Sequence, residues 1–257
     1  MKYIYGPVSS WRLGVSLGID LLSQDKKICT FDCTYCQIGR TPAVSTDRRV
    51  FVPVQEIVRE LRELPELKID YITIAGRGEP CLAENLGEMI VAAKTIMARP
   101  VAVLTNATLL DRDVVMQELA LADVVVAKLD VWSQESFDLI NNPAAGISFD
   151  GIYQGIKRFR QKYQGRLALQ MMFVPENKEA AEKMAELAFE INPDEVQINT
   201  PLRACEVTPL SREEICKIQE YFQGIPTISA YDTEHHHDEP ISVEDTAKRR
   251  GEVFSSS

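Results

Sequence analysis

The sequence predicts an α/β fold in which six βα units form a partial TIM-like barrel, a (βα)6 arrangement with short N- and C-terminal extensions. From about residue 12 onward, short β-branched runs alternate with helical patterns every 25 to 30 residues or so. No Gly- or Pro-rich linker separates the repeats, which favours one curved sheet over two domains. A complete eight-unit barrel would need about the whole chain of 257 residues, so a partial barrel fits better.

Six segments are expected to be strands because they are mostly apolar, as strands covered on both faces should be. They are 13–22, 70–76, 100–106, 123–130, 166–174 and 194–200. The segments between them show helical spacing; in the first, Ile57, Leu61 and Leu64 fall on one face. The expected helices are 54–64, 84–98, 111–120, 149–163, 177–190 and 211–222.

The core domain is expected to span residues 1–230, followed by a C-terminal extension over 231–257. The extension loses apolar periodicity and is rich in charge, which predicts an irregular segment able to act as a lid. Its three adjacent histidines, His235, His236 and His237, fit either a solvated run or a metal site. The charged run AKRRGE near residue 250 is expected at the surface.

The composition bears on partners and location. A net charge of -10 argues against a surface built to neutralise phosphates, so a nucleic-acid partner is not expected, although a local basic patch is compatible with it. The N-terminus does not resemble a signal peptide, and no apolar run reaches the roughly 18 residues of a membrane span. We therefore expect a cytoplasmic protein, in which clustered thiols more often bind metal than form disulfides.

Three cysteines, Cys29, Cys33 and Cys36, form a C-x3-C-x2-C motif after the first predicted strand, where barrels place active sites. A short loop with three thiolates can bind three irons of one cubane and leave the fourth iron without a protein ligand. A structural zinc site usually has four ligands, often in two C-x2-C pairs. The other cysteines are isolated, at Cys81, Cys205 and Cys216. An iron–sulfur cluster is therefore favoured over zinc.

At this motif the sequence resembles the radical S-adenosylmethionine (radical SAM) superfamily, whose cysteine spacing includes an aromatic residue before the last cysteine, here Tyr35. The resemblance implies that the thiolates hold one 4Fe-4S cluster and that S-adenosylmethionine binds its unique iron. It further implies reductive cleavage of S-adenosylmethionine to a 5′-deoxyadenosyl radical, which abstracts hydrogen from a substrate. A reductant such as flavodoxin or ferredoxin would supply the electron.

The resemblance covers about residues 10 to 205 and includes the segment AGRGEP. Its Gly76, Arg77, Gly78 and Glu79 resemble the family's glycine-glutamate motif, which receives the ammonium group of the cofactor. Glycines allow a close approach of the backbone to a ligand, and an ammonium group needs acceptors. On its own, the segment would also fit a simple turn.

Two later strand ends also resemble cofactor-binding regions. Thr105 and Asn106 resemble a threonine-asparagine turn beside the cofactor, although Asn106 would equally suit a chain turn. Lys128 and Asp130 alternate within a buried strand and should point to the same side. Because buried charges are costly, a ligand or ion-pair role is expected for both, and the resemblance places them near the ribose or the substrate.

Four polar residues are candidates for the substrate region. Gln170 and Asn199 lie inside apolar strands, where an amide commonly satisfies neighbouring backbone groups. Arg203 follows the last predicted strand, and Arg12 precedes the first. A guanidinium at such a position is suited to bind a carboxylate or a phosphate.

Within the superfamily, GPVSSWRLG, CTFDCTYCQIGRT, LINNP and QINTPLR resemble compact single-domain Fe-S oxidoreductases related to wyosine synthases. Those synthases carry a further cysteine set upstream, whereas no cysteine precedes Cys29 here, so one cluster is predicted. The leading expectation is an enzyme acting on a small-molecule or peptide substrate. The alternatives are a tRNA-base-modifying enzyme, a glycyl-radical activase and a non-catalytic Fe-S protein.

Overall fold

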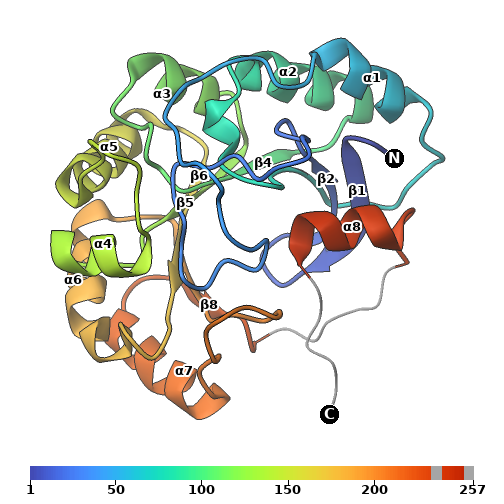
Figure 1. Cartoon of the computed structure of the whole chain (residues 1–257). Helices are drawn as coiled ribbons and strands as arrows, with labels where there is room; N and C mark the ends of the chain where they lie inside the picture. The colour runs from blue at the N-terminus through green and yellow to red at the C-terminus, as the bar shows by residue number, and fades with distance from the viewer. Residues whose placement is uncertain (233–238, 252–257) are drawn as a thin grey trace.

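A curled sheet of eight strands forms the centre of the protein (Figure 1). The computed structural model describes residues 1–232 and 239–251. The strands adjoin in chain order: β1 (Ile4–Ser10), β2 (Gly14–Ile19), β3 (Tyr71–Ile74), β4 (Val101–Thr105), β5 (Val124–Lys128), β6 (Arg166–Met172), β7 (Glu195–Asn199) and β8 (Thr227–Ser229). β1 pairs antiparallel with β2, and every later pair is parallel. The predicted partial barrel is confirmed.

Helices surround the sheet in Figure 1, since each parallel connection needs a crossover. Their bounds are α1 (Val54–Arg62), α2 (Leu86–Met97), α3 (Asp113–Leu119), α4 (Gln134–Ile140), α5 (Phe149–Lys162), α6 (Ala181–Ile191), α7 (Arg212–Gln219) and α8 (Val243–Arg250). Capping boxes at Ser133 and Ser211 begin α4 and α7, because each serine hydroxyl accepts a backbone N–H of the first turn. The six predicted helices each correspond to an observed one.

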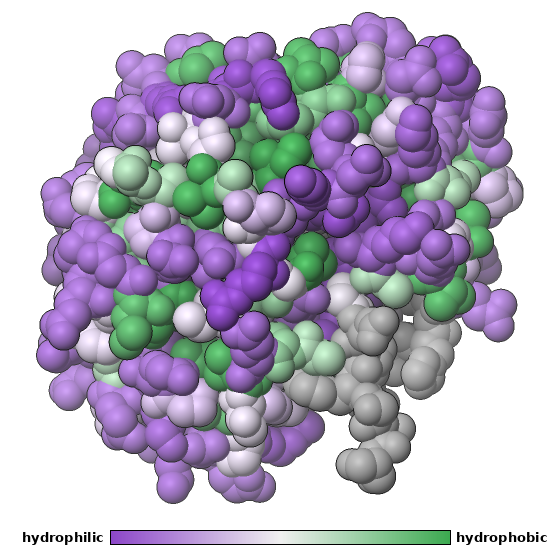
Figure 2. All heavy atoms as spheres, viewed as in Figure 1, coloured by the Kyte–Doolittle hydropathy of each residue, from purple (hydrophilic) through white to green (hydrophobic). Residues whose placement is uncertain are grey.

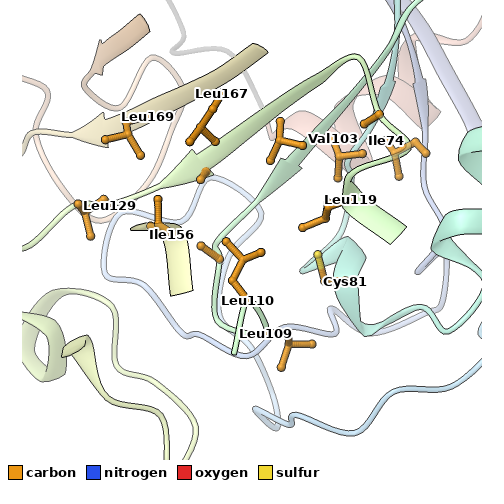
Figure 3. Close-up of a cluster of buried hydrophobic side chains, with 14 of the residues drawn as sticks. Ile74, Cys81, Val103, Leu109, Leu110, Leu119, Leu129, Ile156, Leu167 and Leu169 are labelled. Carbon is orange, nitrogen blue, oxygen red and sulfur yellow. The ribbon is translucent and has the colours of Figure 1, made fainter. Parts of the chain in front are cut away.

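The main core lies between the outer face of the sheet and the helices. Figure 3 shows Ile74, Val103 and Leu167 of the strands in one cluster with Leu119 of α3 and Ile156 of α5. Alternation along each strand gives this face to every second residue. Cys81 belongs to this core, where it is 1% exposed.

The inner face of the sheet changes from apolar to polar along the strands. Near the strand starts it is apolar, and Leu13 of the β1–β2 turn packs against Ala102, Val124, Val126 and Ala168. On β5 the same face continues from Val126 to Lys128, because residues two apart share a face. The polar end of the barrel is therefore the end at which the parallel strands finish.

The two edge strands, β1 and β8, and two helices, α4 and α8, were absent from the sequence prediction. β8 has three residues and α4 has seven, too few for a clear periodic pattern. The expectation of an irregular C-terminal extension was wrong for α8, which packs against β1. Its buried residues are Thr246 and Arg249, so the buried stripe is polar and apolar periodicity does not reveal it. His235, His236 and His237 lie outside the described residues.

The face of the protein drawn in Figure 2 is mainly polar. Figure 2 shows a face on which hydrophilic side chains predominate and hydrophobic ones form small separate groups. Among the described helices, none combines the length and the apolar character needed to cross a membrane.

Candidate functional site

A cavity of about 1030 Å³ is lined by the carboxyl ends of the parallel strands and extends to the β1–β2 turn, which precedes the start of β2. It brings together residues from the β1–β2 turn, the loop after β2, the ends of β3 to β7, and α8. Fourteen of the residues singled out in the sequence line it: Arg12, Cys29, Cys33, Tyr35, Cys36, Gly76, Gly78, Glu79, Thr105, Asn106, Lys128, Gln170, Asn199 and Arg203. Among the candidate cluster, cofactor and substrate residues, Arg77 and Asp130 are not part of the lining.

The three cysteines of the loop after β2 lie beside nitrogen donors. Lys128 Nζ is 3.2 Å from Cys33 Sγ, and Lys27 Nζ is 3.0 Å from Cys36 Sγ. Asn106 Nδ2 is 3.8 Å from Cys29 Sγ. The pKa of the Cys29 thiol is raised to about 12, mainly by burial and in part by the neighbouring Cys33 and Glu79. Thiolates here therefore need positive charge nearby, which the two lysines supply.

The donor set fits an iron–sulfur cluster. All three thiols are free and line one cavity, and a cubane attaches each thiolate to a different iron. In residues 1–232 and 239–251, no group of three or more His, Cys, Asp or Glu side chains is arranged to hold a single metal ion. The three thiols and the two adjacent ammonium groups suit a cluster that carries negative charge.

A buried polar network lies behind Cys33. The Tyr35 hydroxyl donates to Asp130, and Lys128 Nζ lies 3.1 Å from Asp130 Oδ2. Asn141 Nδ2 donates to Asp130 Oδ2 at 3.1 Å and lies 3.5 Å from Cys33 Sγ. Burial acts to lower the pKa of Lys128, but Asp130 and Cys33 raise it above its ordinary value. Lys128 is thus held as a cation, and Asp130 acts on the cavity through its neighbours.

The glycine-glutamate segment is packed directly against the cysteine loop. Gly78 forms an isolated parallel bridge with Ile28, and the Glu79 N–H donates to the Ile28 carbonyl at 3.1 Å. Gly78 has φ +145°, and a Cβ there would lie 1.6 Å from the Ile28 carbonyl oxygen. Only glycine allows this approach. Arg77 departs from the expectation, because its guanidinium donates to the carbonyl groups of Gln24 and Asp25.

Glu79 is buried, and the end of β4 fixes its orientation. Its carboxylate accepts from the Thr105 hydroxyl at 2.6 Å, the Asn106 N–H at 2.6 Å and the Cys81 N–H at 3.0 Å. Burial raises the pKa of Glu79, and these hydrogen bonds act in the opposite direction. The Asn106 side-chain oxygen accepts from the Thr108 N–H, which confirms the expected chain turn, and Asn106 also lines the cavity.

The candidate substrate residues occupy the other side of the cavity. The Arg12 guanidinium lies 4.3 Å from the ring centroid of Trp11, and Arg203 donates to the Gly251 carbonyl at 2.8 Å. Burial, with a smaller contribution from Arg250, lowers the pKa of Arg12 to about 9 and that of Arg203 to about 10. Gln170 and Asn199 line the cavity beside them.

Sequence reasoning missed four residues of this region: Lys27, Asn141, Arg249 and Arg250. A lysine two positions before a cluster cysteine is a signal of charge compensation, whereas Asn141 in LINNP has no local signal. The expectation of a surface position for the run AKRRGE was wrong for two members. Arg249 is buried in an ion pair with Asp20, at 3.2 Å, and Arg250 lines the cavity. Both placements depend on the docking of α8.

Comparison with known proteins is consistent with this site. The family model described as the Radical SAM superfamily matches residues 26–188. The UPF0026 protein slr1464 of Synechocystis sp. is 43% identical over 211 residues, covering 82% of this chain and 78% of that protein.

Solved structures show the same fold at low sequence identity. A radical SAM methyltransferase from Sphaerobacter thermophilus aligns with a TM-score of 0.63 and 16% identity, covering 93% of this chain and 70% of that one. Streptococcus suis SuiB bound to S-adenosylmethionine aligns with a TM-score of 0.63 and 14% identity over 79% of this chain. The present chain spans 48% of the length of SuiB.

Proposed function

Because this chain belongs to the radical SAM superfamily and is an enzyme of that family, whose members bind a 4Fe-4S cluster and S-adenosylmethionine, we propose a specific reaction for it. The enzyme reductively cleaves S-adenosylmethionine and abstracts hydrogen from a small-molecule or peptide substrate. One observation carries this proposal: Cys29, Cys33, Cys36 and Glu79 line a single cavity. When bound, the cluster and S-adenosylmethionine supply the electron and the 5′-deoxyadenosyl radical for this chemistry.

The residues of the chain have distinct roles in this proposal. The three cysteines hold the cluster. Lys27 and Lys128 offset the negative charge on the sulfur atoms of Cys36 and Cys33, respectively. Glu79 accepts the ammonium group of S-adenosylmethionine and is oriented by Thr105 and the Asn106 backbone. The buried carboxylate needs no reorganisation when the cofactor arrives, because three donors already fix it.

A reductant such as flavodoxin or ferredoxin completes the proposal. Cys33 and Cys36 also line a second cavity, of about 550 Å³, on the side of Gln37, Arg40 and Lys248. Cys33 and Cys36 line both cavities, so the second, smaller cavity gives the cluster loop a further approach, which supports electron entry apart from the substrate. The relation to wyosine synthases stays a prediction, as do the alternative functions of a tRNA-base-modifying enzyme and a glycyl-radical activase.

The cluster assignment is tested by anaerobic reconstitution with iron, sulfide, dithionite and S-adenosylmethionine. Cys29→Ala should lose the catalytic cluster and all 5′-deoxyadenosine formation, because only two thiols remain. Cys216→Ala is the matched control, since Cys216 is exposed and lies on α7. Stoichiometric zinc without iron or sulfide, or full turnover by Cys29→Ala, would overturn the proposal.

The role of Glu79 is tested separately from the cluster. Glu79→Ala should weaken S-adenosylmethionine binding by roughly 10- to 100-fold, as expected for loss of a hydrogen bond to a charged group. Its iron content should stay at the level of the wild type. Glu63→Ala, at an exposed residue after α1, is the control. Unchanged S-adenosylmethionine affinity in Glu79→Ala would remove Glu79 from the cofactor site.

A further inference from the structure

The charge of the cavity differs in sign from that of the whole chain. Its charged lining consists of one acidic residue, Glu79, and six basic ones: Arg12, Lys27, Lys128, Arg203, Arg249 and Arg250. The chain as a whole has a net charge of -10. Basic residues therefore outnumber acidic ones in this cavity, although acidic residues outnumber basic ones in the whole chain.

Three of the six cations already have anionic or sulfur partners. Lys128 pairs with Asp130, Arg249 pairs with Asp20, and Lys27 lies beside Cys36. The other three are Arg12, Arg203 and Arg250, which we call the arginine cluster. Within residues 1–232 and 239–251, no carboxylate lies within 4.0 Å of their guanidinium nitrogens.

The arginine cluster is assembled from three distant parts of the chain. Arg12 comes from the β1–β2 turn, Arg203 from the segment after β7, and Arg250 from the last turn of α8. Arg12 Nε is buried and has no hydrogen-bond partner among the described residues. Arg203 uses Nη1 for the Gly251 carbonyl. Buried donors without partners are unfavourable, so this arrangement is suited to a ligand that supplies acceptors.

Mutual repulsion within the arginine cluster points in the same direction. Burial lowers the pKa of Arg12, Arg203 and Arg250, and Arg250 further lowers the pKa of the other two. An anion bound by these guanidinium groups would offset both the cost of burying their charge and the repulsion between them. Carboxylate and phosphate oxygens match the planar donor fork of arginine better than other common groups.

We propose that Arg12, Arg203 and Arg250 bind the oxyanion group, carboxylate or phosphate, of a small substrate, and that α8 completes this substrate site. The inference rests on the proposed function and specifies its substrate class. Gln170 and Asn199, which line the same cavity, supply neutral donors and acceptors beside the anion. Pockets for single small ligands span roughly 300–1,000 Å³. The cavity measures about 1030 Å³, and the proposed function places S-adenosylmethionine in it as well, so the remaining room suits a small substrate.

The test uses the reconstituted holoenzyme with S-adenosylmethionine at saturation and constant ionic strength. Inorganic phosphate and malonate are titrated separately by calorimetry, and the tighter of the two identifies the type of oxyanion. Arg203→Gln and Arg250→Gln should each weaken the tighter probe by roughly 10-fold or more, the loss expected for a charge-assisted hydrogen bond. Arg62→Gln, an exposed residue of α1 with the same change in charge, should bind as the wild type does.

Arg203→Lys covers the case in which a glutamine variant does not fold. It keeps the charge but not the two-nitrogen fork, so binding should weaken less than in Arg203→Gln. Probe binding that is absent, or equal in the wild type and both glutamine variants, would overturn the inference. A loss of S-adenosylmethionine affinity in these variants would also overturn it, because the arginines would then hold the carboxylate of the cofactor.

Iron content and 5′-deoxyadenosine formation by the wild type are measured in parallel. If the wild type assembles a cluster and cleaves S-adenosylmethionine but binds neither probe, the substrate inference alone fails. If it assembles no cluster, the proposed function fails.

Discussion

The two sides of the cavity differ in how their charges are satisfied. On the cofactor side, formed by the loops after β2 to β5, Glu79 and Asp130 each accept three hydrogen bonds from the chain. On the opposite side, the arginine cluster has no carboxylate partner among the described residues. The first side is therefore organised before a ligand binds, whereas the second is completed electrostatically by its ligand.

The largest expected effect tests the close packing of the cofactor side. Gly78→Ala should lose most of its iron after reconstitution, because the new Cβ would meet the Ile28 carbonyl and displace the cysteine loop. Gly146→Ala is a matched control, since Gly146 also has a positive φ, of +85°, but open space at its Cβ. The control should have wild-type iron content and lose about 1 kcal/mol of stability through backbone strain. Equal iron in both variants would contradict the packing argument.

A second prediction uses α8 to test whether the arginine cluster can be disturbed without affecting the cluster-binding cysteines. Arg249→Met leaves Asp20 unpaired where the two side chains are 4% and 2% exposed. The free energy of unfolding should fall by about 3–5 kcal/mol, as for other broken buried ion pairs. Phosphate and malonate binding should weaken, while iron content should stay unchanged, because no cluster ligand lies on α8.

The control for this helix is Lys248→Met, where the lysine is 52% exposed and pairs with Glu244 on the same helix. Its stability should change by less than about 0.5 kcal/mol. Urea denaturation gives the free energies. Equal stability of the two variants would show that the Arg249–Asp20 pair does not hold α8 in place.

A third prediction concerns the potential of the cluster. Lys128→Met keeps the length of the side chain but removes a cation 3.2 Å from Cys33 Sγ. The reduced cluster is the more negative state, so its reduction potential should fall by on the order of 100 mV. Lys157→Met, at a lysine paired with Glu190 outside the cavity, should leave the potential unchanged. Electron paramagnetic resonance during a redox titration measures both, and an unchanged potential in Lys128→Met would contradict the charge-compensation role.

The smallest effect concerns the orientation of Glu79. Thr105→Val preserves shape but removes the hydroxyl that donates to Glu79. The loss of one hydrogen bond, about 1 kcal/mol, should weaken S-adenosylmethionine binding by roughly 5-fold. Thr95→Val removes an exposed hydroxyl of α2 that bonds only to its own helix and should not change the affinity. Equal affinities in the two variants would mean that the Thr105 hydroxyl does not orient the carboxylate.

The cofactor side could be inferred from sequence because its parts are short contiguous motifs. The spacing of Cys29, Cys33 and Cys36 is itself the chemical signal, and Gly76 to Glu79 follow at the end of the next barrel strand. The alternation of strands and helices likewise predicted β2 to β7. Arg77 shows the limit of this reasoning, because adjacency in a motif does not specify where a side chain points.

The opposite side could not be inferred in the same way. Arg250 follows Arg12 by more than two hundred positions. In addition, α8 has no apolar stripe from which its packing against β1 could be predicted. The run AKRRGE has the composition of a solvated surface segment, yet Arg249 is buried against Asp20. Asn141 reaches the cysteine loop from the end of α4, and its local sequence carries no signal of that contact.

The order of residues along the chain was enough to predict the class of fold, the three clustered thiols and the glutamate that lines the same cavity. These features depend on periodicity and spacing, which are local properties. The positive side of the cavity, the buried Arg249–Asp20 pair and the polar network behind Cys33 required the folded coordinates. Burial and the cancellation of charge depend on distances between segments far apart in the chain, and only packing sets those distances.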